Sequence, residues 1–99
     1  MNMGIIEPFK DGFLEIIPEG KGSDYWQIAA IHISGEVFCP SPRIYPSQDV
    51  AFARARRIFN WICNHEMETR GWGCYCEELN MSLWRQPKSY PSNSLPTAF

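Results

Sequence analysis

The chain has 99 residues, a formal net charge of −2 and 44% hydrophobic residues, which fits one folded domain and excludes a wholly disordered chain. Its nine Lys and Arg against eleven Asp and Glu give no basic excess, so a nucleic-acid partner is disfavoured. We find no secretion signal and no apolar run of membrane-spanning length. We therefore expect a soluble, cytoplasmic protein without a membrane partner.

The first half of the chain predicts an antiparallel sheet. Residues 1–11 are expected to be a lead-in without regular structure, because Pro8 disfavours a strand. Three segments rich in β-branched and aromatic residues then predict strands at 13–17, 25–33 and 36–39. Ser34 and Gly35 supply a tight two-residue turn between the second and third of these.

The segment 25–33 is apolar on both faces, which is typical of a central strand. Strict alternation places Ile31 on one face and Ile28 on the other. Because proline cannot donate a ladder hydrogen bond, we expect the third strand to end at Pro40 or to lie at an edge of the sheet.

A helix is predicted to follow from Gln48 to Cys63, or on through Met67. Ser47 is a favourable N-cap, and Asp49 lies in the first turn, where the helix dipole favours a carboxylate. At helical spacing the apolar residues form one arc for packing on the sheet, comprising Ala51, Phe52, Ala55, Ile58, Phe59, Ile62 and Cys63.

Residues 74–84 fit either a strand or a helix, and alternation over 79–83 favours a fourth strand. As a single strand this segment would carry Tyr75, Met81 and Leu83 on one face. Residues 86–99 are rich in Pro and Ser and predict a flexible C-terminal tail. The expected fold is an α+β domain over residues 12–85, with three to four strands and one helix on one face, in the order β-β-β-α(-β).

One flank of the predicted helix combines basic and aromatic side chains. Arg54, Arg57 and Trp61 fall outside the apolar arc, and the spacing of Arg57 and Trp61 allows a cation–π contact. Trp and Arg are enriched in binding hot spots, so this flank is a candidate partner-binding surface. In the alternative interpretation the segment after Gly71, or the tail, covers Trp61 and the flank is a packing face.

Four potential metal ligands lie in the second half of the chain. Cys63, His65, Cys74 and Cys76 could form a tetrahedral zinc site or a redox-responsive cluster. One residue between the last two cysteines is not the spacing of the commonest zinc knuckles. The alternative is a buried Cys63 with reduced thiols at the other positions, and on that basis we expect no bound cofactor.

The sequence contains no recognisable catalytic motif. The two histidines, His32 and His65, lie in a predicted strand and near the predicted helix end, and no nucleophile elbow or phosphate-binding loop occurs. We therefore expect a protein that is not an enzyme.

The sequence thus favours a small protein–protein interaction or regulatory module that binds a protein partner or self-associates. Its candidate surfaces are the helix flank and an exposed sheet edge near Val37 and Phe38. One alternative is the metal- or redox-responsive cluster. A second alternative is a nucleic-acid accessory protein that uses Arg54 and Arg57 as a basic patch.

Overall fold

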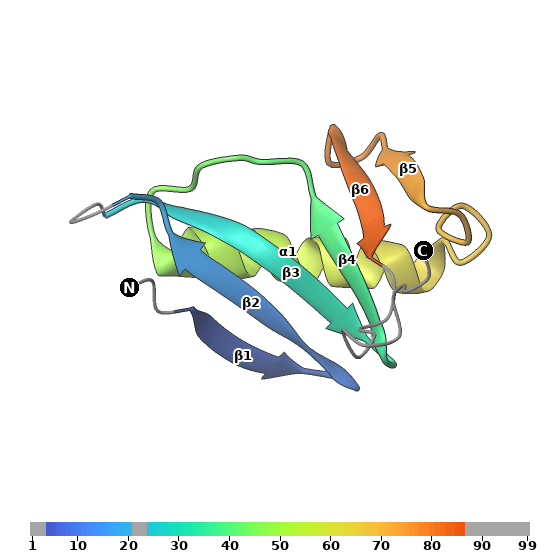
Figure 1. The fold of residues 1–99 in the computed structure, drawn as a ribbon, viewed down its shortest axis with the longest axis horizontal. Coiled ribbons are helices and arrows are strands. Elements are labelled where there is room, and N and C mark those ends of the chain that lie inside the picture. The colour runs from blue at the N-terminus through green and yellow to red at the C-terminus, as the bar shows by residue number, and fades with distance from the viewer. Residues whose placement is uncertain (1–3, 21–23, 87–99) are drawn as a thin grey trace, which may run out of the picture.

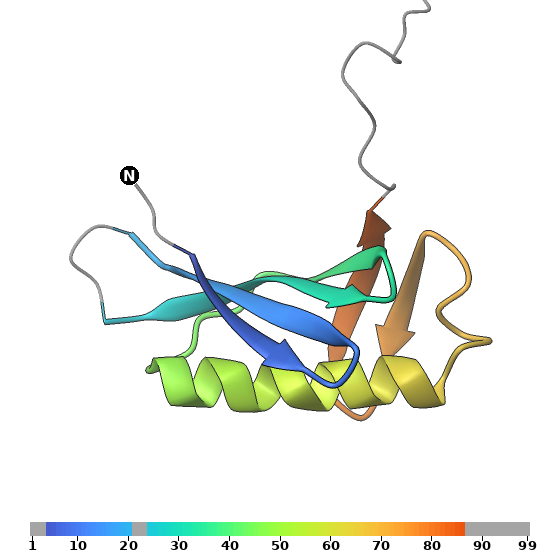
Figure 2. The ribbon, with the colours of Figure 1, turned by 90° about the horizontal axis from the view of Figure 1, so that it is seen from below.

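The computed structural model describes residues 4–20 and 24–86 and shows an α+β fold. Within these residues one helix lies against one face of a six-stranded antiparallel sheet of order β1-β2-β3-β4-β6-β5 (Figures 1 and 2). The elements are β1 (Ile5–Phe9), β2 (Gly12–Pro18), β3 (Trp26–Ile33), β4 (Glu36–Pro40), α1 (Gln48–Asn64), β5 (Gly73–Cys76) and β6 (Met81–Gln86). The α+β class is confirmed, whereas the predicted three to four strands and their order are wrong in detail.

The predicted N-terminal lead-in contains strand β1, which forms a hairpin with β2. Pro8 is paired with Phe13, and it is tolerated because β1 is an edge strand with one side free of ladder bonds. The inference from proline was therefore wrong because it took no account of the strand's position in the sheet.

The β1-β2 hairpin is fastened to α1 by three contacts. The ring of Phe9 meets that of Phe59 edge to face, with 5.0 Å between centroids. Arg56 Nη1 lies 2.5 Å from Glu7 Oε2, and Lys10 Nζ donates to Asn60 Oδ1 at 2.7 Å. These contacts hold β1 over the helix and extend the sheet beyond the predicted domain start.

Strand β3 contains a β-bulge that changes which side chains reach the core. Glu15 is paired with Ala30, but Ile16 is paired with Ile28, so Ala29 is the extra residue. The bulge brings Ile28 to the same face as Ile31, and both are buried in the core. The predicted placement of these two isoleucines on opposite faces is therefore wrong.

The turn between β3 and β4 is confirmed, because Ser34 and Gly35 both have positive φ, at 50° and 81°. Strand β4 ends at Pro40, which is the first of the two predicted outcomes, and it is not an edge strand, because it lies between β3 and β6. Beyond the end of the strand, the Ser41 N–H donates to the carbonyl of Ser82 at 2.8 Å. The predicted sheet edge near Val37 and Phe38 is thus inside the sheet.

Helix α1 begins as predicted and ends earlier than its longest predicted extent. The hydroxyl of Ser47 accepts a hydrogen bond from Val50 N at 3.1 Å, and Asp49 lies in the first turn. The helix ends at Asn64, with His65 as the C-cap residue, and does not reach Met67. Its buried residues are Ala51, Phe52, Ala55, Ile58, Phe59, Trp61 and Ile62.

Two side chains of α1 depart from the predicted arc. Cys63 is exposed, so its predicted place in the apolar arc, and the alternative of a buried Cys63, are wrong. Trp61 is buried, although the wheel placed it outside. Trp61 joins a core cluster that includes Cys76 and Leu79, so the chain after Gly71 widens the buried side of the helix.

Residues 74–84 form two strands instead of one. Strands β5 and β6 are antiparallel and joined by residues 77–80, where Asn80 has φ 55° and its N–H donates to the carbonyl of Glu77 at 3.2 Å. Because of this turn, the side chains that face the core are at even-numbered positions in β5 and at odd-numbered positions in β6. Met81 and Leu83 are buried in the core, whereas Tyr75 lies on the opposite face and is exposed.

The predicted flexible tail was expected to begin at residue 86, but Gln86 is the last residue of β6. The rest of the predicted tail, residues 87–99, lies outside the described residues. In the described part of the chain, no helix has both the length and the apolar character needed to cross a membrane.

Candidate interaction surfaces

Figure 2 shows that α1 lies on one side of the sheet and that the other face is turned away from it. The residues on that other face include many apolar side chains. We call this surface the outer face. Its members follow from the alternation along each strand, since neighbours of core residues point outward. They include Ile6, Pro8, Phe13, Glu15, Ile17, Gln27, Ala30, His32, Val37, Cys39, Tyr75, Ser82, Trp84 and Gln86.

Three large side chains of the outer face are more than half exposed. Ile6 is 57% exposed, Tyr75 53% and Trp84 54%. The Trp84 indole lies over Gly73, where an added Cβ would come within 2.7 Å of the ring. This contact between neighbouring strands holds the indole against the sheet surface. Exposed apolar side chains grouped on one face mark interaction surfaces more often than scattered ones do.

The outer face has few ionisable groups. His32 Nε2 lies 3.2 Å from Glu15 Oε1, and the His32 ring stacks on Phe13 with 3.9 Å between centroids and 13° between planes. The partial burial of Cys39 raises the pKa of its thiol, and the nearby Glu15 charge raises it further against the lowering effect of a hydrogen bond with Gln86. The described strand residues of this face include no Lys or Arg. The surface is thus largely apolar and close to neutral.

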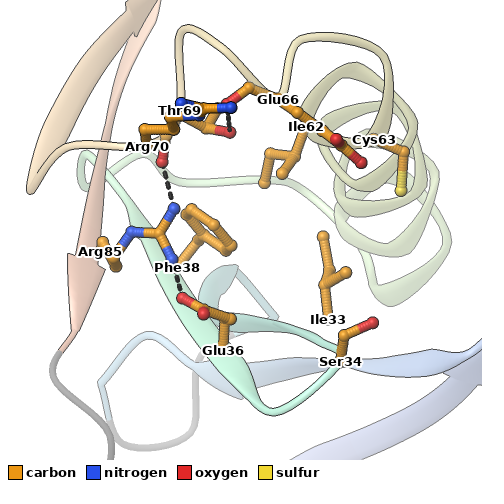
Figure 3. A pocket seen from close by; sticks show the side chains of 10 residues that line it. All are labelled: Ile33, Ser34, Glu36, Phe38, Ile62, Cys63, Glu66, Thr69, Arg70 and Arg85. Carbon is orange, nitrogen blue, oxygen red and sulfur yellow. Dashed lines mark hydrogen bonds and ion pairs between the residues drawn. The ribbon is translucent and has the colours of Figure 1, made fainter.

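A cavity of about 290 Å³ lies between the end of α1 and the sheet, beside Arg85 (Figure 3). The Arg85 guanidinium pairs with Glu36, donates to the carbonyls of Thr69 and Gly71, and lies over the Phe38 ring at 4.8 Å. Arg85 therefore ties the segment after α1 to strands β4 and β6.

We expect Arg85→Lys to lower the free energy of unfolding by about 1–2 kcal/mol, because an ammonium group cannot reproduce the planar fork of donors. Amide hydrogen exchange in residues 65–72 should become faster, because the guanidinium donates hydrogen bonds to two carbonyls of this segment. Arg70→Lys is the control, since Arg70 is exposed and lines the same cavity. Equal urea midpoints for the two variants would contradict the fastening role of Arg85.

Phe38, a candidate for partner binding, is 4% exposed and lies beneath the Arg85 guanidinium. Its ring is therefore part of the core and offers little surface to a partner. Its neighbour Val37 is partly exposed on the outer face.

The predicted helix flank is only partly open. Trp61 is 7% exposed and stacks on His65, with 4.3 Å between ring centroids. An Arg57–Trp61 contact is not among the cation–π contacts of the described residues, in which the indole stacks on His65, one turn further along the helix. Arg57 is exposed and Arg54 is partly buried. Partner binding through these two arginines stays a prediction, as does the basic-patch alternative.

His65 adds a hydrogen bond to this stack. Its Nδ1 lies 2.8 Å from the carbonyl oxygen of Trp61, and since a carbonyl only accepts, Nδ1 carries the proton. The stack borders a hollow of about 450 Å³ that is also lined by Glu68, Glu77 and Glu78. Trp61 is buried in one cluster with Cys76 and Leu79 of the segment after Gly71, which agrees with the packing interpretation.

The four potential metal ligands lie in different surroundings. Cys76 is buried in the core, Cys74 is partly buried beside it, Cys63 is exposed on α1, and His65 caps the helix. Across residues 4–20 and 24–86, no three His, Cys, Asp or Glu side chains are grouped to hold a metal ion. Burial is the largest cause that raises the thiol pKa of Cys63, Cys74 and Cys76.

The raised pKa of Cys63 predicts a slow reaction with alkylating agents at neutral pH. Partial burial acts most strongly on this thiol, followed by the Asp11 carboxylate, and both hold its pKa above the usual 9.0. Since only the thiolate reacts, the rate with iodoacetamide should rise about tenfold per pH unit from neutrality and level off above that value. Mass spectrometry of the modified peptide measures the rate at each pH. A plateau below about pH 8 would instead indicate an activated thiolate and favour the redox alternative.

The sequence interpretation missed the outer face. The sequence does contain a signal for this face. Apolar residues occur at both odd and even positions of 13–17, and Leu83 is followed directly by Trp84. A strand with apolar side chains on both sides is buried on both sides only if other elements cover both faces of the sheet. The single helix covers one, and the other remains uncovered by the described residues (Figure 2).

Comparison with known proteins gives no relative for this chain. No family model, curated protein or solved structure matches it.

Proposed function

We propose that this chain is a non-enzymatic protein-interaction module that binds through the outer face of its sheet. The observation that carries the proposal is that Ile6, at one side of the sheet, and Tyr75 and Trp84, at the other, are each more than half exposed on the face that the helix leaves open. Apolar groups of this size favour burial against a partner, at about 25 cal/mol for each Å² removed from water.

The charge pattern supports a protein partner over a nucleic acid. The described strand residues of the outer face supply no Lys or Arg to contact phosphates, and the carboxylate of Glu15 would repel them. Depletion of charge is instead typical of the centre of a protein interface.

The chemistry of the ionisable groups supports a binding role without a catalytic step. His32 is held between the Phe13 ring and the Glu15 carboxylate, and burial raises the pKa of the Cys39 thiol. Protonated thiols are poor nucleophiles, so Cys39 is poorly suited to covalent chemistry at neutral pH.

Photo-crosslinking in cells that produce the protein tests the proposal. A photoreactive phenylalanine analogue replaces Trp84 on the outer face, and in a separate chain it replaces Trp72. Trp72 is 68% exposed and follows the helix, outside the strands. We expect discrete crosslinked protein bands from position 84 and not from position 72. The absence of protein adducts at position 84 would contradict the proposal.

A further inference from the structure

We infer that the occupant of the outer face is a second copy of this chain, packed sheet against sheet about a two-fold axis. The inference rests on the proposed function and names its partner. Four properties of the outer face carry it: its shape, its charge, its size and its freedom from covering elements among the described residues.

The shape of the outer face is complementary to itself. Phe13, His32 and Val37 are paired in succession across β2, β3 and β4 and form a ridge. Ala30 of β3 and Cys39 of β4 lie in the next row of this face, and their small side chains form a short trough between Glu15 of β2 and Trp84 of β6. A two-fold axis that runs across the strands between the two rows sets His32 and Val37 of each copy against Ala30 and Cys39 of the other, and Phe13 against Glu15. Large side chains set against small ones are the arrangement that packed sheets favour.

The charge of the outer face permits this arrangement. A two-fold interface brings identical patches together, so unpaired charges near its centre would repel their own copies. Here the Glu15 carboxylate lies against His32 within the same copy, at 3.2 Å. Each copy therefore presents a largely apolar surface with its one strand carboxylate already partnered.

The size of the outer face matches a weak dimer. Six strands give five spacings of about 4.8 Å, a width of about 24 Å. Strands β2 and β3 have seven and eight residues, or lengths of about 23–26 Å, and the others are shorter. Two such faces bury about 1,000–1,200 Å² together, the lower end for specific interfaces. We therefore expect a dissociation constant of about 1–100 µM.

Sedimentation equilibrium of the purified full-length chain, from about 1 to 500 µM, tests the inference. We expect reversible dimerisation. Trp84→Ser and, at the other side of the sheet, Ile6→Lys should each raise the dissociation constant at least about tenfold, because each alters a large side chain in the interface. Trp72→Ser makes the same change at a more exposed indole outside the outer face and should leave the constant unchanged. Circular dichroism checks that each variant is folded.

Two results would overturn the inference. One is a wild-type chain that stays monomeric at the highest concentration, and the other is a dimer that both outer-face variants leave intact. A monomer that still forms crosslinks to other proteins through position 84 would keep the proposed function and exclude the second copy. A monomer without such crosslinks would remove both.

Discussion

Trp61→Ala is expected to lower the free energy of unfolding by about 3–5 kcal/mol, as for other buried aromatic side chains replaced by alanine. Trp61 is 7% exposed, stacks on His65 and belongs to the core cluster that contains Leu79 and Cys76. Its removal leaves a cavity between α1 and the β5-β6 turn. In a domain of this size the melting temperature should fall by about 12 °C or more.

Trp72→Ala is the matched control for this substitution. The Trp72 indole is 68% exposed, so its loss should change the free energy of unfolding by about 0.5 kcal/mol or less. Urea unfolding of both variants supplies the comparison. If Trp61→Ala cost no more than the control, the indole would not be a packing group, and the helix flank would regain its place as the leading binding surface.

Gly12→Ala is the second substitution with a large expected effect, a loss of about 3 kcal/mol, at the upper end for overpacking. An added Cβ would lie 1.9 Å from the carbonyl oxygen of His32 and 3.0 Å from Cε2 of Phe59. The oxygen is main-chain and cannot rotate away as a side chain can. The β1-β2 hairpin must therefore move off β3, and the Phe9–Phe59 contact weakens with it.

Gly71→Ala provides the same chemical change where there is room for it. No heavy atom lies within 4 Å of the position its Cβ would take, so its stability should stay within about 1 kcal/mol of the wild type. Thermal unfolding of the two variants measures the difference. Similar melting temperatures would show that β2 does not approach β3 as closely as described.

Local signals in the sequence predicted the features that depend on local chemistry. Ser47 and Asp49 mark the start of α1 because a hydroxyl and a carboxylate satisfy free N–H groups at that point. Ser34 and Gly35 predict their turn because both residues must take positive φ. These features depend on a few adjacent residues and on no distant part of the chain.

The features that were missed depend on distant partners. Pro8 is compatible with a strand only because β1 is at the edge, and Ile28 joins the core only through the bulge at Ala29. Trp61 is buried only because the β5-β6 turn folds back over α1. A helical wheel or a simple alternation does not indicate which distant segments of the chain pack against a residue.

The candidate surface was missed for a related reason. Both candidate residues with large apolar rings, Phe38 and Trp61, are buried, whereas Trp84 and Tyr75 on the outer face are exposed, as are Tyr25 and Trp72 outside it. A residue's type indicates that it favours burial, whereas the arrangement of the elements decides which such residues remain exposed. With one helix and one sheet among the described elements, the outer face leaves Ile6, Tyr75 and Trp84 exposed, while other large apolar side chains, such as Ile44, Met67 and Trp72, are exposed outside it.

The most direct test of the outer face as the self-association surface is a dilution series of amide NMR spectra on the isotope-labelled chain. Between about 500 and 10 µM, we expect concentration-dependent shifts at amides beside Ile6, Phe13 and Trp84, and none on the exposed side of α1 at Ala53 and Arg57. Shifts concentrated on α1, or spectra that do not change with concentration, would contradict self-association through the outer face.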